Sequence, residues 1–535
     1  MSTSGKQRIK VLHIGNIANY AYNIAKLLQT DQIHSDAISW DYYHINSRPI
    51  WEEGDFDASN AGDQFFPLLP RPQDAGFDQP DWYWHGPRKL AMLGLIAANE
   101  GRRGLSQIIR RQCERHLRRI ADPVYRASDH SDVKAAAVLA SDLLGGFGSP
   151  KTPRYASRWL RTRRWGHPLA SISDRIAQFG EARASRRFTI SEVSASFTER
   201  ADALLERFKS DWPERSIDPM LLYQYQGDLD VMERLFSHYD IVIGYALDGI
   251  WPLMAKRPYV AYEFGTIRNL PFEDSLMGRL ASVVYRNCES TIVTNCDNEA
   301  PAKRLERPYR FLPHVINETG RVDSADDIRN RLVGEHGGEF YIFHPPRHHW
   351  DDERNTNWDK GNDKLIHAFQ QLVQKHGIDA RCVFVNWGAT LDKSKALAEE
   401  LGVADKIIWI DPQPHRRMMR YIAACDVVAD QFTIPTFGGI PPKAFFAKRP
   451  VVTCFDPDLH RWCFDELPPL IAASSPSEIE AALLQLATDQ NFARQVAEDA
   501  AEWYRKENSN ERIREILVEI VEDAVERHPN RNADS

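Results

Sequence analysis

Two basic side chains and a pair of glycines follow predicted strands in the second half of the chain. Arg347 comes just after one apolar run, Lys360 lies in the loop that follows it, and Gly438 and Gly439 come after another run. The carboxyl ends of parallel strands share one edge of a sheet, and ligands bind there. Arginine holds a phosphate through a planar fork, lysine supplies a point charge, and glycine lets a ligand approach the backbone. This pattern predicts a site for a nucleotide diphosphate.

A third cation, Lys443, lies one turn into the helix that is predicted after the glycines. We expect the start of that helix to present free N–H groups and about half a unit of positive charge to the phosphates. Three cations make a divalent metal unnecessary, and we expect no metal and no other cofactor. His344, His348 and His349 lack the spacing of a metal site.

The elements that must position these residues alternate regularly. Apolar runs predict strands, and amphipathic runs between them predict helices. Short connections between such units favour a parallel sheet with right-handed crossovers. We expect strands at 340–344, 381–386, 406–410, 426–430 and 450–454, helices at 361–376, 392–401, 414–424 and 440–447, and terminal helices at 476–487, 490–506 and 510–527.

The first half begins with the same kind of unit. A strand predicted at 9–14 runs into Gly15 and Asn16, and a helix is predicted at 19–29. The turn reads GNIAN and lacks the GxGxxG fingerprint, so dinucleotide binding is not indicated. His13 is expected to fill the strand. Residues 46–85 are expected to form a loop, and further strands are predicted at 241–244, 259–263 and 291–295.

Residues 86–230 read as a helical insertion within this first α/β domain. The whole chain carries a net charge of −8, but residues 88–187 hold 21 Lys/Arg against 8 Asp/Glu. A solvated arginine face is one explanation. An anionic membrane surface is another, because Trp159, Leu160 and Trp165 stand among the arginines. No nucleic-acid motif accompanies the charge.

These features together resemble a glycosyltransferase of the GT-B fold, and within it the retaining family-four type. The resemblance rests on segments 15–16, 263–268 (EFGTIR), 312–314, 347, 360–361, 386–388, 424–428 and 448–452. It implies an α/β protein with two Rossmann-like domains whose parallel sheets face a central cleft. The expected domains are 1–325 for the acceptor, 326–505 for the nucleotide-sugar donor, and a helix and tail at 506–535 that packs back on the first domain.

The donor loop departs from the family pattern. The family has two glutamates around the glycine loop, and Pro435 and Lys443 occupy those positions here. The resemblance implies that the first glutamate orients the sugar and the second holds the ribose, so neither role carries over. Asp430 or Gln431 is a nearby substitute.

The resemblance also suggests roles for other residues. Arg347, Lys360 and Glu263 are the catalytic candidates, although Glu263 could equally be a structural carboxylate. The donor-side candidates are Gly438, Gly439, Lys443, Asn386, Trp387, Gln431 and His344, and the acceptor-side candidates are Gly15, Asn16, Asp248 and Arg268.

The predicted function is transfer of a sugar, with retention and without metal, from a nucleotide-sugar to a glycan, lipid-linked or small-molecule acceptor, as in polysaccharide biosynthesis. Two alternatives stay open, namely a catalytically degenerate GT-B subunit that partners an active transferase, and a nucleotide-sugar epimerase. No run reaches the roughly 20 apolar residues that span a bilayer, and the seven cysteines are irregularly spaced. We therefore expect free thiols in a cytoplasmic protein that is peripheral on the cytoplasmic membrane face.

Overall fold

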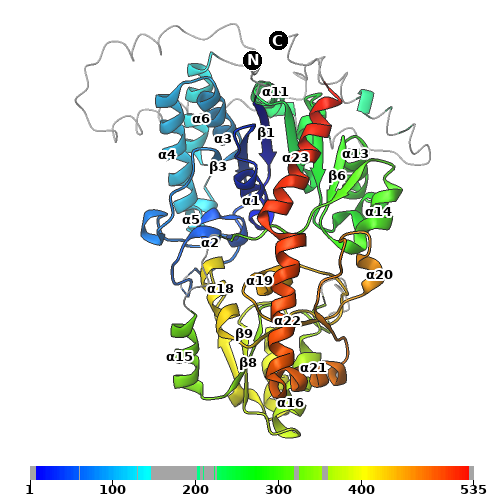
Figure 1. Cartoon of the computed structure of the whole chain (residues 1–535). Helices are drawn as coiled ribbons and strands as arrows, with labels where there is room; N and C mark the ends of the chain where they lie inside the picture. The colour runs from blue at the N-terminus through cyan, green and yellow to red at the C-terminus, as the bar shows by residue number, and fades with distance from the viewer. Residues whose placement is uncertain are drawn as a thin grey trace, which may run out of the picture.

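The chain folds into two α/β domains that meet face to face (Figure 1). The computed structural model describes residues 8–59, 61–128, 130–145, 226–318, 325–351 and 359–528, together with a few positions between 202 and 222. The N-terminal domain is built on a seven-stranded sheet and the C-terminal domain on a six-stranded sheet. The predicted fold class, α/β with two parallel sheets, is confirmed.

The N-terminal sheet has the strand order β3-β2-β1-β4-β5-β6-β7, and every pair is parallel. Apart from the edge strand β7, its strands are largely buried on both faces, which explains their nearly continuous apolar sequences. They are β1 (Ile9–Ile14), β2 (Ile33–Trp40), β3 (Tyr83–Gly86), β4 (Ile241–Tyr245), β5 (Tyr259–Tyr262), β6 (Ser290–Val293) and β7 (Tyr309–Phe311).

The helices of this domain connect and cover those strands. Residues 46–85 were expected to be loop, but they contain α2 and β3, so that prediction is wrong. The strand β2 had not been predicted either. The helices are α1 (Tyr20–Leu27), α2 (Pro49–Glu53), α3 (Arg88–Asn99), α4 (Arg103–Arg119), α5 (Pro123–Arg126), α6 (Ser131–Leu143), α11 (Leu229–Phe236), α12 (Ile250–Met254), α13 (Leu276–Arg286) and α14 (Glu299–Arg304).

The C-terminal sheet has the order β10-β9-β8-β11-β12-β13 and is also parallel. The strands are β8 (Phe340–His344), β9 (Ala380–Val385), β10 (Ile407–Ile410), β11 (Val427–Ala429), β12 (Val451–Thr453) and β13 (Ile471–Ala472). The helices are α15 (Asp326–His336), α16 (Asn362–Gln374), α17 (Leu391–Glu400), α18 (His415–Ala424), α19 (Pro441–Phe446), α20 (Pro457–His460), α21 (Pro476–Thr488) and α22 (Gln490–Trp503). Each predicted strand and helix of this half is present within a few residues.

The last helix, α23 (Asn510–Glu526), returns to the N-terminal domain (Figure 1). Its residues Ile513, Leu517 and Val521 are buried in one core with Val11 and Ile243. The chain therefore crosses twice between the domains, because α22 packs in the C-terminal core through Trp503.

The helices at 88–143 share a core with the N-terminal sheet. Ile109 and Cys113 of α4 are buried with Trp84 of β3. The arginines of α4 are partly engaged, since the guanidinium of Arg110 lies 4.3 Å from the ring of Trp84. The helical prediction holds for this part. Trp159, Leu160, Trp165 and most of 146–225 lie outside the described residues.

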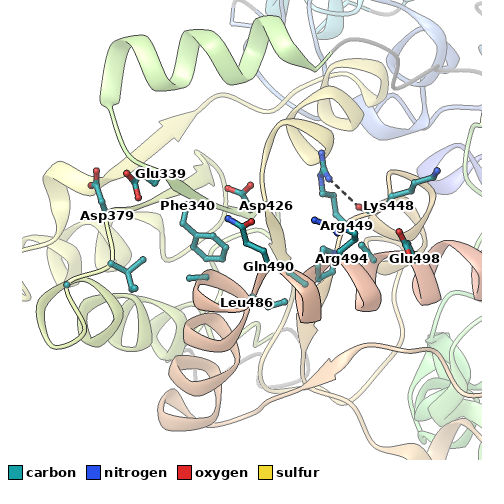
Figure 2. A pocket seen from close by; sticks show the side chains of 16 residues that line it. Glu339, Phe340, Asp379, Asp426, Lys448, Arg449, Leu486, Gln490, Arg494 and Glu498 are labelled. Carbon is teal, nitrogen blue, oxygen red and sulfur yellow. Dashed lines mark hydrogen bonds between the residues drawn. The ribbon is translucent and has the colours of Figure 1, made fainter.

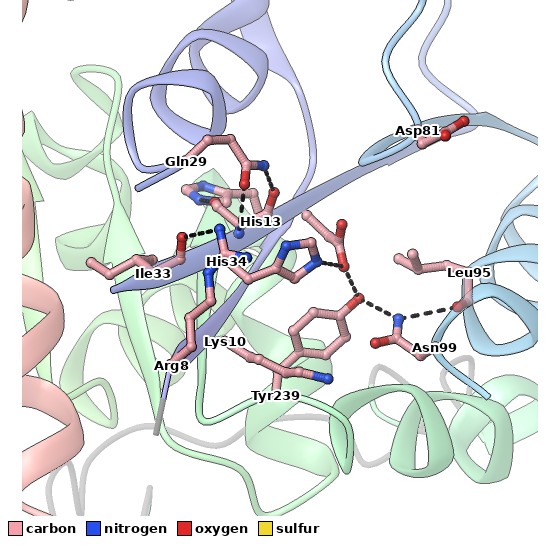
Figure 3. Close-up of polar contacts among 12 residues, drawn as sticks. Arg8, Lys10, His13, Gln29, Ile33, His34, Asp81, Leu95, Asn99 and Tyr239 are labelled. Atoms are coloured by element: carbon pink, nitrogen blue, oxygen red, sulfur yellow. Dashed lines mark hydrogen bonds and ion pairs between the residues drawn. The ribbon is translucent and has the colours of Figure 1, made fainter. Parts of the chain in front are cut away.

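Polar side chains of β1 and β2 are held by internal hydrogen bonds. The carboxylate of Asp36 accepts from the hydroxyl of Tyr239 at 2.7 Å, and Asn99 donates to that hydroxyl at 2.9 Å (Figure 3). His13 bonds Tyr245 and Ser35 through its two ring nitrogens, at 2.9 Å each. Its burial lowers its pKa to about 3, so it is a neutral residue that fills the strand, as expected.

Among the described residues all seven cysteines are free. In the same part of the chain, none of the helices combines the length and apolar character needed to cross a bilayer.

Candidate donor and acceptor sites

The carboxyl ends of the two sheets face each other across the domain boundary. Gly439 follows β11 of the C-terminal sheet, and Tyr20 begins the helix after β1 of the N-terminal sheet. A Cβ atom on Gly439 would lie 3.7 Å from the Tyr20 hydroxyl. The helices α2 and α18 also meet there, and Arg417 pairs with Asp55 at 2.9 Å. The loops that were predicted to carry the site therefore face a common interdomain cleft.

Lys360 lies at the center of the donor side. Its ammonium donates to Oε1 of Gln431 at 2.6 Å, and the amide of Gln431 donates in turn to Oγ1 of Thr436 at 2.8 Å. Burial lowers the pKa of Lys360, and Asp430 partly offsets this effect. The pKa of Asp430 is raised to about 6 by burial, against the influence of Lys360. Gln431 and Asp430 are the nearby substitutes for the missing glutamates. Gln431 accepts a hydrogen bond from Lys360, and Asp430 acts on the charge of Lys360.

Two arginines lie within electrostatic reach of Lys360. Arg347 of the same domain and Arg268 of the N-terminal domain both lower its pKa. Arg347 is half-buried, and this burial lowers its own pKa. Lys360 thus has one arginine from each domain near enough to act on its charge, and grouped cations of this kind suit a diphosphate.

Arg268 is held in place by a carboxylate of its own domain. Its Nη2 donates to Oδ1 of Asp297 at 2.8 Å, and Nε bonds Oδ2 of the same residue. This pairing raises the pKa of Arg268 and fixes its direction. The residue was predicted on the acceptor side, and the structure places it at the boundary between the two sides.

His344 positions the donor loop and has no ring nitrogen left for a ligand. Its Nδ1 lies 2.8 Å from the carbonyl of Ala429 and its Nε2 lies 2.8 Å from the amide of Asn362. The oxygen of Asn362 accepts from the backbone of His349 at 3.0 Å. Burial lowers the pKa of His344 to about 4, so it is neutral. Its prediction as a donor contact is corrected to a structural role.

The glycine pair is open, but the helix after it differs from the prediction. A Cβ on Gly438 would meet no atom within 4 Å, and neither glycine has a positive φ. The helix α19 begins with Pro441 and Pro442, which lack N–H groups. The expected row of free N–H donors at this helix start is therefore wrong, whereas close approach of a ligand to the glycines is possible.

Lys443 points toward the N-terminal domain. Burial lowers its pKa, while Glu52 of α2 acts to raise it. Within the described residues its ammonium makes no hydrogen bond or ion pair. It lowers the pKa values of His314 and His415. Lys443 thus lies near polar side chains of both domains, and its role in donor binding stays a prediction.

Asn386 and Trp387 follow β9 at the same edge. The indole of Trp387 donates to the carbonyl of Pro345 at 3.2 Å and packs on the C-terminal core. The side-chain oxygen of Asn386 is buried without a hydrogen bond. Gly388 has a φ of 116°, and a Cβ there would collide with the backbone of His348. Trp387 therefore supports the loop of Arg347, and Asn386 has an oxygen available for a ligand.

Glu263 is a structural carboxylate. It is fully buried at the end of β5. Its Oε1 accepts from the backbone of Thr294 at 2.9 Å, and its Oε2 accepts from Asn298 at 3.0 Å and from the backbone of Gly265. Burial raises its pKa although these bonds lower it. Because it is buried and both of its oxygens bond groups of its own domain, Glu263 has a structural role, and its catalytic assignment is corrected.

Gly15 and Asp248 lie together on the acceptor side. Gly15 has a φ of 91°, and a Cβ there would lie 2.4 Å from Oδ2 of Asp248. Burial raises the pKa of Asp248 to about 7, while Arg88 acts to lower it. This carboxyl is the strongest acceptor-side candidate. A larger residue than glycine at position 15 would displace it.

Asn16 is corrected to a structural role. Its amide donates to the carbonyl of Ser47 at 2.9 Å and to the hydroxyl of Tyr83 at 3.1 Å, and its oxygen accepts from the backbone of Tyr22 at 3.1 Å. It joins the loops after β1 and β2 and leaves nothing for a ligand.

Sequence analysis missed an interdomain polar cluster. The hydroxyl of Tyr20 and Nδ1 of His314 lie 2.5 Å apart, and Nε2 of His314 is buried without a partner. Glu52 lies 3.6 Å from His415. Residues 312–314 are part of the resemblance to the family. Glu52 lies in the stretch 46–85 that is expected to be loop, and no local sequence signal marks it.

Within the described ranges, no group of three or more His, Cys, Asp or Glu side chains could hold a metal. A hollow of about 690 Å³ lies elsewhere, at the amino edge of the C-terminal sheet. Phe340, Asp426, Arg449 and Gln490 line it (Figure 2). Phe340 begins β8, and Asp426 and Arg449 precede β11 and β12. The hollow therefore lies at the opposite edge of the sheet from Lys360.

Fold and site together define an α/β protein of two parallel-sheet domains, with basic side chains in the loops at their boundary. Residues 354–503 match the family model described as Glycosyl transferases group 1. This match confirms the resemblance to that family for the C-terminal domain. A search among curated proteins found no match.

Solved structures with similar folds have low sequence identity. HepE from Anabaena, in complex with UDP and glucose, is 15% identical over 56% of this chain and 83% of its own, with a TM-score of 0.46. Sucrose-phosphate synthase from Thermosynechococcus elongatus is 14% identical over 55% and 78%, with a TM-score of 0.42. MnaA from S. aureus with UDP is 10% identical over 96% of both chains, with a TM-score of 0.42.

Proposed function

We propose that the protein transfers a sugar from a nucleotide-diphosphate-sugar to a hydroxyl of an acceptor, with retention and without metal. The observation that carries the proposal is that Lys360, held by Gln431 at 2.6 Å, follows β8 at the same sheet edge as the open Gly438 after β11, with Arg347 and Arg268 close enough to act on its charge. The family match over the C-terminal domain supports the same reaction class.

The cations suit the charge that develops in this reaction. When the bond between the anomeric carbon and the diphosphate oxygen breaks, negative charge collects on the leaving diphosphate. Donors that already point at that charge stabilise the transition state without reorganising. Lys360 is held by Gln431, and Arg268 is held by Asp297. Both are therefore fixed before the donor binds.

The open space at Gly438 and Gly439 gives the sugar and diphosphate room beside these cations. Asp248 and Gly15 lie on the other wall, where the acceptor would enter. Asp430, whose pKa is about 6, can accept a hydrogen bond from a sugar hydroxyl when it is ionised. It takes the place of the first glutamate of the family pattern in this proposal.

A donor panel tests the proposal. The protein is incubated with UDP-, GDP-, ADP- and CMP-sugars and a mixture of glycan and lipid-linked acceptors, and released nucleotide and glycosylated product are measured. The proposal predicts product with one donor class and loss of product in Arg347→Ala. Epimer formation without transfer would support the epimerase instead.

A second candidate is a catalytically degenerate subunit that binds a nucleotide-sugar and partners an active transferase. It is favoured by Pro435 and Lys443 at the two acidic positions. Tight binding of a donor with no turnover under any acceptor condition would support it.

We further propose a cytoplasmic location with contact to an anionic membrane face through residues 88–187, and a role in polysaccharide synthesis. In α4 the exposed arginines include Arg111, Arg115 and Arg118. Sedimentation with anionic vesicles, compared with neutral vesicles, tests the membrane contact.

A further inference from the structure

The N-terminal domain contains a half-buried arginine, Arg48, whose charge no carboxylate among the described residues pairs with. Arg48 precedes α2, and its backbone is fixed because its carbonyl accepts from Asn19 at 3.1 Å and from Trp51 at 2.8 Å. Its side chain makes no hydrogen bond or ion pair within the described residues, and Nη1 is shielded from solvent without a partner. Burying a charge in this way is costly unless something pairs with it.

The groups around Arg48 are aromatic and neutral. Burial lowers its pKa, and the groups that act in the opposite direction are the hydroxyls of Tyr83 and Tyr43. Two nearby histidines cannot add charge at neutral pH. The pKa of His85 is well below its usual value and that of His116 is about 4, both chiefly because of burial.

His85 supplies a second unpartnered atom, and it lies close enough to Arg48 for the positive charge to lower its pKa. His85 is buried, and its Nε2 lies 3.0 Å from the carbonyl of Tyr42, so the proton is on Nε2 and Nδ1 is an acceptor. That Nδ1 atom has no hydrogen-bond partner. The ring of Tyr43 stacks on His85 at 5.6 Å and fixes it. Two unpartnered atoms, Nη1 of Arg48 and Nδ1 of His85, therefore belong to one polar cluster.

This cluster lies on the acceptor side of the cleft. His85 is in register with Ser39 near the carboxyl ends of β3 and β2. Asn16 in the loop after β1 bonds both Tyr83 and Ser47, next to Arg48. The acidic neighbour on this loop is Asp41, which accepts a hydrogen bond from the hydroxyl of Tyr43 at 3.3 Å. Burial raises the pKa of Asp41, and the charge of Arg88 acts to lower it.

We propose that Arg48 and His85 form a subsite for an oxyanion that adjoins a hydroxyl on the acceptor. The guanidinium takes the oxyanion, a carboxylate or a phosphate, through its planar fork. The hydroxyl donates to Nδ1 of His85. The acceptor class is therefore an acidic sugar or a phosphorylated sugar or polyol. This inference rests on the proposed function, because it assigns the acceptor of the same cleft.

Calorimetry with simple probes tests the subsite. Glucuronate, glucose 6-phosphate and neutral glucose are titrated into the wild-type protein and into Arg48→Gln, Arg48→Lys and the control Arg71→Gln, in which an exposed arginine of the same domain is changed. We expect the wild type to bind one of the two anions and to discriminate against glucose. Arg48→Gln should raise the dissociation constant about 10- to 100-fold, the range for loss of a charged hydrogen bond.

The relative affinities for the three probes distinguish the possible acceptors. Preference for glucuronate identifies a carboxylate acceptor, and preference for the sugar phosphate identifies a phosphate acceptor. Arg48→Lys, which keeps the charge but loses the fork, should fall between wild type and Arg48→Gln. Equal affinity for glucose and both anions in the wild type, a comparison that needs no variant, would overturn the proposal. So would unchanged anion affinity in folded Arg48→Gln.

The result is independent of the donor. If no nucleotide-sugar binds but the anion does so through Arg48, the proposed transferase function fails and the oxyanion subsite stands. If a donor binds normally to Arg48→Gln and anion binding never depends on Arg48, the subsite fails and the transferase stands.

Discussion

The ammonium of Lys360 donates a hydrogen bond to Oε1 of Gln431 at 2.6 Å. This bond joins the loop after β8 to the end of β11, the two neighbouring strands at the middle of the C-terminal sheet. The lysine is therefore held in position before any ligand binds, and the group that holds it is an amide rather than a carboxylate.

Lys360→Met should weaken binding of the nucleotide diphosphate about 10- to 100-fold, because methionine keeps the apolar stem and removes the charge. Calorimetry with the preferred nucleoside diphosphate measures this. Lys393→Met serves as the matched control, since Lys393 pairs with Asp351 on the surface. Equal affinity in wild type and Lys360→Met would remove Lys360 from the site.

Glu263→Gln should lower the free energy of unfolding by about 1–3 kcal/mol, because the new NH₂ group would face donors from Gly265 and Asn298 or from Thr294. Turnover of the folded fraction should stay close to the wild-type value. Urea unfolding and initial rates are the measurements, with exposed Glu399→Gln as control. A loss of turnover of a thousandfold or more with unchanged stability would restore Glu263 as a catalytic residue.

Lys443→Glu should change the order of preference among donors and reduce stability, since a carboxylate there would meet Glu52 instead of offsetting its charge. Lys443→Met provides the neutral comparison. Thermal shifts with the four donor classes report both effects. If all three proteins rank and bind the donors alike, Lys443 does not face the bound donor.

Asp248 should make the protein less stable as the pH rises from about 4 to about 7. Its folded pKa is raised to about 7 by burial, so the folded state keeps a proton that the unfolded chain has already released. Asp248→Asn should remove this contribution and gain stability relative to wild type between pH 5 and pH 8. Urea unfolding at four pH values in that interval tests it, and parallel curves for the two proteins would contradict it.

The second half of the fold could be predicted closely because its strands are buried on both faces and read as apolar runs between amphipathic helices. The loop at 46–85 could not, since β3 is a four-residue edge strand and α2 is held by contacts with α18 of the other domain. Such tertiary contacts leave no periodic signal.

For the site, the sequence indicated that Arg347, Lys360 and the glycine pair share one edge, because parallel topology requires it. It could not show that Glu263 and Asn16 are saturated by internal hydrogen bonds, which depend on segments far away in the chain. Nor could it reveal Arg48, because an arginine without a partner looks the same in sequence as one with a partner. Pro441 and Pro442, by contrast, are a local signal in the sequence that a row of free N–H groups is absent at the start of α19.

The central claim is that cations in the cleft hold a diphosphate. Titration calorimetry of the preferred nucleoside diphosphate into wild type and Arg347→Ala, with exposed Arg461→Ala as control, measures it most directly. The account predicts that Arg347→Ala loses about 1.5–3 kcal/mol of binding free energy while Arg461→Ala loses none. Identical affinity in all three proteins would contradict it.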